Sequence, residues 1–403
     1  MRQLFFQEGK TNMNTSAQSR LKEVKSIYLH IPFCSTKCPY CDFASWANSE
    51  HLIDNYFNAL TNEIETKCNA YTDYRNAVVE TPQRGVSTIK TIFIGGGTPS
   101  LIPSEYYKKL FHELKKYFVF SENCEITLEL NPGTAREDYL KGYKELGINR
   151  ISIGAQSFNQ QILDLLGRKH SVADTVYAIE QVKNAGFKNF SLDLIYAVPE
   201  MKKEIWLDTI YRAIEFAPKH ISAYSLTIEK NTPFASVYSD SKLLLSDDFT
   251  YELYMDLCII LKKESFIHYE ISNFAKKDFE SRHNINYWDG GDFFAFGNSA
   301  HRCLNGMRTK NLRNLQEYIN NPYLEEIVDL TSDKFDKVML NLRLNRGVEF
   351  DLLKQVSERE ENDLTKLLTD LSAEGYLNLR DDKVFLTDKG FFVSNEILVK
   401  LAQ

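Results

Sequence analysis

The sequence predicts an α/β fold in which helices cover a parallel sheet, and three observations lead to this prediction. Short runs rich in β-branched and aromatic residues recur between residues 26 and 226. Amphipathic stretches with helical spacing separate these runs. Glycines, cysteines and polar residues gather where the runs end. Consecutive strand–helix units of this kind form either an open doubly wound sheet or a barrel.

The strand candidates share a short length and a high content of β-branched and aromatic residues. They read SIYLHI from Ser26, IKTIFIG from Ile89, EITLEL from Glu125, RISIGA from Arg150, KNFSLDL from Lys188 and KHISAYSL from Lys219. Because a helical stretch separates each strand from the next, neighbouring strands are expected to run parallel.

Apolar stripes and end signals predict the helices between these strands. Residues 104–118 place apolar side chains on one stripe at helical spacing. Ser171 and Asp174 have the spacing of a capping box at the start of a later helix. The long first connection is expected to hold one helix around residues 51–70 and a polar loop over residues 81–85.

Composition divides the chain into four segments. Residues 1–25 form a polar tail, and residues 26–240 hold the strand–helix units. Residues 241–329 form an aromatic-rich connecting region in which the alternation fades. Residues 330–403 are predicted to be a winged-helix-like α+β unit, because helical stretches precede the alternating hairpin YLNLRDDKVFLT and a last helix follows Asp388.

Length, charge and cysteine content narrow the class of protein. The 403 residues exceed what one core usually fills, so several units are expected. A formal net charge of −7 does not favour nucleic acid as a partner. The N-terminus lacks the apolar core of a secretory signal, and no apolar run reaches the roughly 18 residues that span a bilayer. An odd number of cysteines, 7, favours a reducing compartment, so the cytosol is expected.

Residues suited to binding or catalysis collect at the ends of successive strand candidates. They are Cys34, Cys38 and Cys41 after the first strand, Gly96, Gly97 and Thr98 after the second, Glu129 in the third, Gln156 after the fourth and Asp193 in the fifth. The carboxyl ends of parallel strands meet at one edge of a sheet. These side chains are therefore expected to share one rim.

Cys34, Cys38 and Cys41 suit an iron–sulfur cluster better than zinc. Structural zinc takes four ligands, commonly two pairs that the fold brings together, whereas here three thiols share one loop and position 43 is Phe43. Three thiolates can hold three irons of a [4Fe-4S] cluster and leave the fourth iron open to a small molecule.

The motif CSTKCPYC resembles the CxxxCxxC signature of the radical S-adenosylmethionine (SAM) family. The strand before it and the GGGTP turn after the second strand strengthen the resemblance. It implies a [4Fe-4S] cluster on the three cysteines, bound SAM, and a partial six-unit (β/α)6 barrel.

The same resemblance implies a set of SAM contacts. Gly96, Gly97 and Thr98 would approach the SAM amino group, because glycines let a backbone come close to a ligand. Glu129 stands in the apolar run ITLEL, where an unpartnered carboxylate is costly, and SAM would supply its partner. Four further positions match the SAM-binding positions, or the tyrosine before HIPFC, in the coproporphyrinogen-oxidase-like branch: Tyr28, Gln156, Arg168 and Asp193.

Within that branch the sequence is most similar to the HemW haem chaperones. GAQSF, LGRKH, HISAYSLTIE and HNINYW all contribute to the likeness. The related oxygen-independent coproporphyrinogen III oxidases carry a further cysteine where this chain has Phe43, and they have a longer N-terminal segment. The HNxxYW motif implies haem contact by His283, Tyr287 and Trp288, with His283 as the iron ligand.

Three hypotheses follow for the function. The first is a haem chaperone that carries the cluster and SAM and transfers haem to an unknown acceptor protein. The second is an oxygen-independent coproporphyrinogen III oxidase, a radical SAM oxidoreductase that forms protoporphyrinogen IX, and the third is a methyltransferase-like radical enzyme. Each needs an electron donor if the cluster is reduced, and transient association with a membrane stays open.

The chain also departs from the family pattern at two turns. The usual Gly-Leu-Pro-Gly after the fifth strand reads AVPE at residues 197–200, and the glycine-rich GxGAHS reads GNSAHR at residues 297–302. Glycines let backbones pack closely, so the shape of the haem or substrate pocket is expected to differ there.

Overall fold

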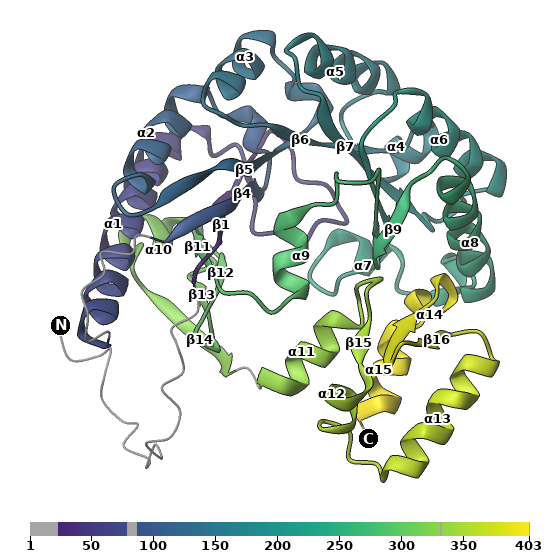
Figure 1. Cartoon of the computed structure of the whole chain (residues 1–403). Coiled ribbons are helices and arrows are strands. Elements are labelled where there is room, and N and C mark those ends of the chain that lie inside the picture. Colours follow the sequence, from purple (N-terminus) through teal and green to yellow (C-terminus); the bar gives the residue numbers. More distant parts are fainter. Residues whose placement is uncertain (1–22, 79–86, 331–332, 403) are drawn as a thin grey trace.

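A curved sheet of 12 strands organises the protein. The computed structural model describes residues 23–78, 87–330 and 333–402 (Figure 1). Six strands lie side by side and parallel in the centre of the sheet: β1 (Ser26–Ile31), β4 (Thr88–Gly96), β5 (Val119–Leu130), β6 (Arg150–Gln156), β7 (Asn189–Tyr196) and β8 (His220–Ser225). These are the strands that the sequence predicts, in their sequence order, and the α/β prediction is confirmed.

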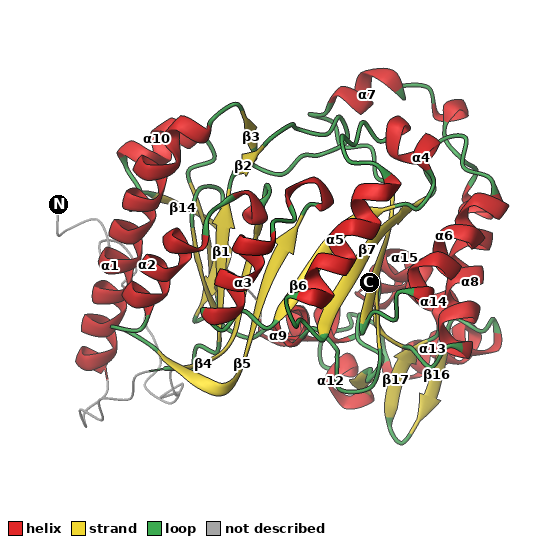
Figure 2. Cartoon of the chain, turned by 90° about the horizontal axis from the view of Figure 1, so that it is seen from above, coloured by secondary structure: helices red, strands yellow, loops and turns green. Residues whose placement is uncertain are grey.

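Helices cover the outer, convex face of this sheet (Figures 1 and 2). They are α1 (Ile53–Val78), α2 (Ser104–Leu114), α3 (Glu137–Glu145), α4 (Gln160–Leu165), α5 (Val172–Asn184), α6 (Lys203–Glu215) and α8 (Asp247–Lys263). The short helix α7 (Pro233–Val237) lies instead beside the cysteine motif, where the Phe234 amide donates to the Pro39 carbonyl at 3.1 Å. The capping box of Ser171 and Asp174 starts α5 as predicted. The predicted polar loop at residues 81–85 and the tail up to residue 22 lie outside the described residues.

Alternation along the central strands sends apolar side chains to the helices and polar ones to the inner face. In β1, for example, Ile27 and Leu29 are completely buried in the core, whereas Tyr28 is half-buried. Glu129 in β5 and Asp193 in β7 also keep some accessible surface on the inner face. The sheet therefore separates an apolar core under the outer helices from a polar surface on its inner face.

Residues 241–329 extend the sheet at both edges, which the sequence did not predict. Beside β1 lie β11 (Phe293–Phe296), β12 (His301–Leu304), β13 (Met307–Asn311) and β14 (Glu325–Leu330), and beside β8 lie β10 (Asn273–Ala275) and β9 (Ile267–Glu270). Most of these strands have only three to five residues, too few for a clear alternating pattern. Two helices accompany them, α9 (Arg282–Trp288) on the inner side of the sheet and α10 (Leu315–Asn320) beside α1 (Figure 1).

The last segment forms a separate small unit with its own three-stranded sheet. It contains α11 (Asp333–Asn341), β15 (Val348–Glu349), α12 (Phe350–Lys354), α13 (Glu361–Ala373), β16 (Leu377–Arg380), β17 (Lys383–Leu386), α14 (Asp388–Phe392) and α15 (Ser394–Ala402). Asp381 and Asp382 both have positive φ, as a two-residue type I′ hairpin turn requires. The predicted hairpin and final helix are present. Among the described helices, none is both long and apolar enough to cross a membrane.

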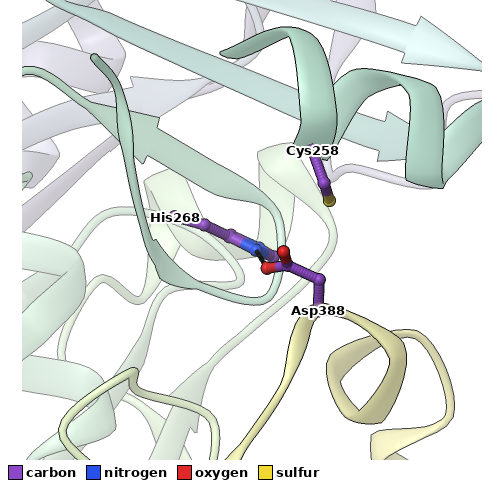
Figure 3. A group of neighbouring side chains, drawn as sticks. All are labelled: Cys258, His268 and Asp388. Atoms are coloured by element: carbon purple, nitrogen blue, oxygen red, sulfur yellow. Dashed lines mark hydrogen bonds and ion pairs between the residues drawn. The ribbon is translucent and has the colours of Figure 1, made fainter. Parts of the chain in front are cut away.

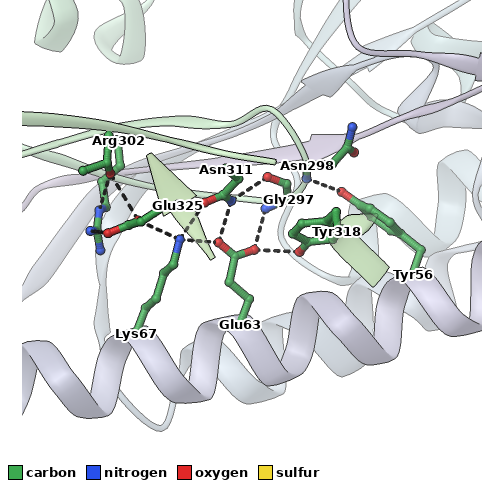
Figure 4. A network of polar contacts seen from close by, with 10 residues as sticks. Tyr56, Glu63, Lys67, Gly297, Asn298, Arg302, Asn311, Tyr318 and Glu325 are labelled. Carbon is green, nitrogen blue, oxygen red and sulfur yellow. Dashed lines mark hydrogen bonds and ion pairs between the residues drawn. The ribbon is translucent and has the colours of Figure 1, made fainter. Parts of the chain in front are cut away.

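A buried polar network fastens α1 to the extended edge of the sheet (Figure 4). Lys67 lies 2.9 Å from Glu63 and 2.9 Å from Glu325, and Arg302 forms an ion pair with Glu325. Glu63 also accepts hydrogen bonds from Asn311 Nδ2, Tyr318 OH and the backbone amide of Gly297. Two acidic and two basic groups thus balance one another inside the protein.

Candidate functional site

The cysteine motif lies on a loop whose two ends are held together. β1 leads into β2 (Phe33–Cys34), and the loop returns at β3 (Trp46–Ala47), which pairs with β2. Within the loop, the amide of Cys41 donates to the carbonyl of Cys38 at 3.1 Å. Cys34 is buried, Cys38 and Cys41 are half-buried, and none forms a disulfide. The loop therefore presents three free thiols at the rim, as predicted.

The surroundings of these thiols suit a ligand that needs thiolates. Burial raises the pKa of Cys34 and of Cys41, so without a metal both remain thiols. Thr98 Oγ1 donates to Cys34 Sγ at 3.5 Å, and the Arg168 guanidinium donates to Cys38 Sγ at 3.5 Å. Hydrogen-bond donors and a cation beside the sulfurs stabilise the negative charge of a bound iron–sulfur cluster. This donor set fits a [4Fe-4S] cluster.

The GGGTP turn packs directly against the cysteine loop. The amides of Gly97 and Thr98 donate to the carbonyls of Ile31 and Phe33, both at 2.8 Å. A Cβ atom on Gly97 would lie 2.9 Å from Cys34 Sγ, which no side chain tolerates, and Gly96 has a φ of +118°. The structure thus explains why glycine is needed here, while contact with the SAM amino group stays a prediction.

Two acidic side chains face the interior, and within the described part of the chain neither forms an ion pair, although the charge of Arg150 partly offsets both. Glu129 Oε2 accepts a hydrogen bond from the Gly96 amide at 3.1 Å, and Asp193 accepts from Ser152 Oγ at 2.8 Å and Ser191 Oγ at 3.1 Å. Burial, and then the charge of Asp193, raises the pKa of Glu129 to about 7. Burial raises the pKa of Asp193 as well. A cationic ligand between these groups would return both to their charged forms.

Arg168 and Gln156 lie where the fourth central strand meets the cysteine loop. Arg168 follows α4 and donates to the Gly154 carbonyl at 3.1 Å in addition to Cys38 Sγ. Gln156 ends β6 with a positive φ of 63°, an uncommon conformation for a side chain of this kind. Both residues therefore reach the rim, while their contact with SAM stays a prediction.

Tyr28 belongs to a hydrogen-bond chain that sequence reasoning did not identify. Its hydroxyl lies 3.0 Å from His30 Nδ1, and His30 Nε2 lies 2.8 Å from the Ala44 carbonyl. Burial lowers the pKa of His30 to about 4, so its ring is neutral. Nε2–H then donates to Ala44 and Nδ1 accepts from Tyr28. A histidine inside an apolar strand, two residues before Pro32, was the available signal.

The HNxxYW motif forms α9, and its histidine is enclosed. His283 Nδ1 lies 2.9 Å from Thr91 Oγ1, and Nε2 lies 2.8 Å from Tyr287 OH. The His283 side chain is 1% exposed, and burial lowers its pKa to about 3. Trp288 is half-buried under the guanidinium of Arg343. His283 can ligate an iron only if one of its two ring contacts is broken.

A cavity of about 570 Å³ opens between the cysteine loop, α9 and the extended edge of the sheet. Its lining includes Tyr28, Phe43, Tyr287, His301, Arg308 and Arg313. Phe43, noted in the sequence only as the residue that replaces a cysteine, is 67% exposed here. Clefts of roughly 300–1,000 Å³ with mostly apolar walls and a few polar groups are typical small-molecule sites.

A second group of metal-capable side chains lies between the sheet and the C-terminal unit (Figure 3). One ligand atom each of Cys258, His268 and Asp388 lies within 4.8 Å of the others. His268 Nδ1 already contacts Asp388 Oδ1 at 2.7 Å, and its Nε2 lies 3.3 Å from the Ile271 carbonyl. Cys258 is 3% exposed, as expected for a core residue. The group joins α8 and β9 to the start of α14.

Comparison with known proteins identifies two family regions. The family model for the radical SAM superfamily matches residues 28–211, and that for the HemN C-terminal domain matches residues 331–393. A radical SAM domain implies a [4Fe-4S] cluster and SAM, which the donor set of the cysteine loop fits.

Relatives match nearly the whole chain. The heme chaperone HemW of Haemophilus influenzae is 36% identical over 93% of this chain and 96% of its own length. The heme chaperone HemW of Escherichia coli is 34% identical, with 93% of this chain and 97% of that protein covered. The solved structure of Escherichia coli coproporphyrinogen III oxidase (HemN), a radical SAM enzyme, has the same fold, with a TM-score of 0.79 and 20% identity over 95% of this chain and 91% of that one.

Proposed function

Since this chain belongs to the HemW family of radical SAM proteins, we propose that it is a haem chaperone, which binds haem and transfers it to an acceptor protein. The observation that carries the proposal is the full-length similarity to proteins named heme chaperones, over 93% of the chain. The cavity beside the cysteine loop supports it, because Phe43 there adds an apolar surface where the related oxidases have a cysteine.

Cys34, Cys38 and Cys41 would hold the [4Fe-4S] cluster in this function. The cluster supplies an iron with an open coordination position for SAM and a route for one electron. Arg168, which donates to Cys38 Sγ, would stabilise the negative charge of the cluster. The cluster and SAM would act on haem binding or release, and an electron donor would be needed if the cluster is reduced.

SAM would lie over the polar inner face, between the GGGTP turn and the two interior carboxylates. Gly96, Gly97 and Thr98 would bring backbone groups close to its amino group. Glu129 and Asp193 would offset its positive charge and accept hydrogen bonds from its hydroxyl groups. Tyr28, Gln156 and Arg168 would complete the remaining contacts around the rim.

The HNxxYW segment would contribute to haem binding on the opposite side of the cavity. Tyr287 lines the cavity, and its ring lies 4.6 Å from that of Phe293. Flat aromatic surfaces of this kind suit a porphyrin face. His283 and Trp288 would stabilise this wall or contact haem after a rearrangement. We place the protein in the cytosol, where it would associate transiently with a membrane.

The test is an anaerobic assay on the reconstituted protein with SAM and a reductant. Haem is offered to one sample and coproporphyrinogen III to another. Haem that remains bound through gel filtration, without turnover of coproporphyrinogen, is the expected result. Formation of protoporphyrinogen IX with 5′-deoxyadenosine would instead identify an oxidase and overturn the proposal.

A further inference from the structure

The histidine of the HNxxYW motif is poorly placed to bind iron in this structure. Both ring nitrogens of His283 have partners, Thr91 and Tyr287, at 2.9 and 2.8 Å. The backbone amide of His283 is also held, by Glu125 Oε1 at 3.1 Å. A residue held by two ring contacts and one backbone contact in the protein interior acts more readily as a support than as an exchangeable ligand, because each lost hydrogen bond inside a protein costs free energy.

A different histidine faces the cavity with its ring unengaged. His301 begins β12, is exposed and lines the cavity. Within the described residues its ring makes no hydrogen bond, and its closest charged influence is Lys310 on the neighbouring strand. A neutral imidazole whose ring nitrogens are not engaged has a nitrogen lone pair available for a metal.

β12 also places Cys303, a second side chain that can bind a metal, on the same side as His301. Residues two apart in a strand point to the same face, so Cys303 follows His301 into the cavity. Arg302, between them, points to the opposite face and forms an ion pair with Glu325. The alternation of β12 therefore separates two metal-capable side chains from the structural network behind them.

The rest of the lining offers contacts for the flat porphyrin ring of haem and for its negatively charged propionates. Tyr28, Phe43, Tyr287 and Phe293 supply flat aromatic surface. Arg308 and Arg313 supply positive charge, and both can exchange their present partners. Arg308 lies 3.4 Å from Asp329, and Arg313 lies 2.9 Å from Asp42 in an exposed pair. Exposed ion pairs of this kind contribute little to stability and can yield to a carboxylate ligand.

We propose that haem lies in this cavity with His301 as the axial ligand of its iron and with its propionates facing Arg308 and Arg313. The inference rests on the proposed haem binding and assigns the site and the ligand. Tyr287 then forms a wall of the site, and His283 is a positioning residue that holds the Tyr287 hydroxyl through Nε2.

The test compares haem retention and spectra in histidine variants of the full chain with its cluster. Hemin is added, excess is removed by gel filtration, and retained haem is measured as pyridine haemochrome, which the cluster does not affect. His301→Ala is expected to lower retention at least tenfold, while the matched control His112→Ala, an exposed residue on the outer helix α2, retains haem like the wild type. Cluster absorption and circular dichroism confirm that each variant folds.

A rescue experiment separates ligation from a structural role. In His301→Gly, added imidazole is expected to restore the wild-type Soret magnetic circular dichroism, because free imidazole can occupy the vacated position. An unchanged spectrum and unchanged retention in His301→Ala would overturn the inference. So would loss of the signal only in His283→Ala or only in Cys303→Ser, which would assign those residues. A wild type that retains no haem would overturn the proposed function itself.

The propionate contacts have their own measurement. Arg308→Ala combined with Arg313→Ala is expected to weaken binding of haem at least tenfold and to leave binding of haem dimethyl ester, which lacks the carboxylate charges, unchanged. Equal weakening for both ligands would overturn the assignment of the two arginines.

Discussion

Two regions of this protein enclose charged side chains, and they do so in opposite ways. In the network between α1 and the extended sheet edge, Glu63 and Glu325 are matched by Lys67 and Arg302. At the inner rim, Glu129 lies near the charge of Asp193, and within the described residues neither carboxylate forms an ion pair, although the charge of Arg150 partly offsets both. The first region is complete within the chain itself, whereas the second becomes favourable only when a ligand arrives.

This difference distinguishes a buried charge that stabilises the fold from a buried charge that serves a binding site. Glu63 has hydrogen-bond donors at both oxygens, as a satisfied buried carboxylate requires. Glu129 has one backbone donor, and its pKa rises to about 7. Uncompensated groups with shifted pKa values are typical of binding and catalytic sites.

The largest expected effect is at the cysteine loop, where one change should remove a cofactor entirely. Replacing Cys34, Cys38 or Cys41 by Ala is expected to abolish the visible charge-transfer absorption of the reconstituted cluster, because each thiolate holds one iron. Cys258→Ala, far from the loop, is the control and should keep the absorption. A triple variant that still assembles one full cluster would refute the assignment.

Breaking the compensated network should cost the most stability. Lys67→Met leaves Glu63 and Glu325 enclosed without their shared cation, and the expected loss is about 3–5 kcal/mol of unfolding free energy. The matched control is Lys116→Met on the outer surface, where Lys116 is 52% exposed and pairs with Glu113. Its loss should be much smaller, because an exposed ion pair contributes little to stability. Urea unfolding measures both, and equal losses would show that the network is not a balanced unit.

Removing a rim carboxylate should raise the free energy of unfolding, whereas breaking the buried network lowers it. A glutamate whose pKa is raised in the folded state binds a proton more tightly when folded, so its contribution to stability falls as pH rises from its usual value through about 7. The penalty above pH 7 is at most about 3 kcal/mol, and solvent reduces it. In the SAM-free protein, Glu129→Gln is therefore expected to be more stable than the wild type at pH 8 and equal to it at pH 4.

The control for this change is Glu137→Gln, whose exposed side chain should leave the pH dependence unaltered. SAM binding gives the complementary measurement, because a cation favours the ionised carboxylate. Wild-type affinity for SAM should rise as pH increases toward 7, and Glu129→Gln should weaken binding at least tenfold and remove that dependence. Thermal unfolding that shows no pH difference between wild type and Glu129→Gln would contradict the interpretation.

The smallest effect is expected where the C-terminal unit meets the sheet. Contact with His268 holds the pKa of Asp388 below its usual value, so this contribution is present at neutral pH and is lost as pH falls through the lowered pKa. Asp388 is 36% exposed, and Asp388→Asn should cost about 1 kcal/mol at pH 7. Asp381→Asn, at the exposed hairpin tip, is the control in the same denaturant titration.

Features that depend on local pattern were predictable from the sequence, and features that depend on pairing across the chain were not. The central strands, the capping box of α5 and the hairpin at Asp381 each have their signal within a few residues. The cysteine loop was also readable, because its spacing is itself the signal. By contrast, β9 to β13 are short strands whose stability comes from neighbours far along the chain.

The candidate site divides in the same way. Glu129 could be identified as a candidate site residue in the sequence because its carboxylate interrupts an apolar strand. Lys67 and Asn311, which are 244 residues apart and hydrogen-bonded, carried no such signal. His301 was visible only as part of an altered glycine-rich turn, since its free ring and the cavity in front of it exist only once β12 pairs beside β11.

The pairing of β2 with β3 has a consequence for the life of the protein after it loses its cofactor. This pair closes the cysteine loop at Phe33–Trp46 and Cys34–Ala47 through backbone pairing, which does not involve the thiols. Closing a loop is an entropic cost, and here the backbone pairing of the fold contributes to meeting it. A cluster destroyed by oxygen would leave three thiols still gathered at the rim. Repair then needs only iron, sulfide and electrons, with no refolding of the chain.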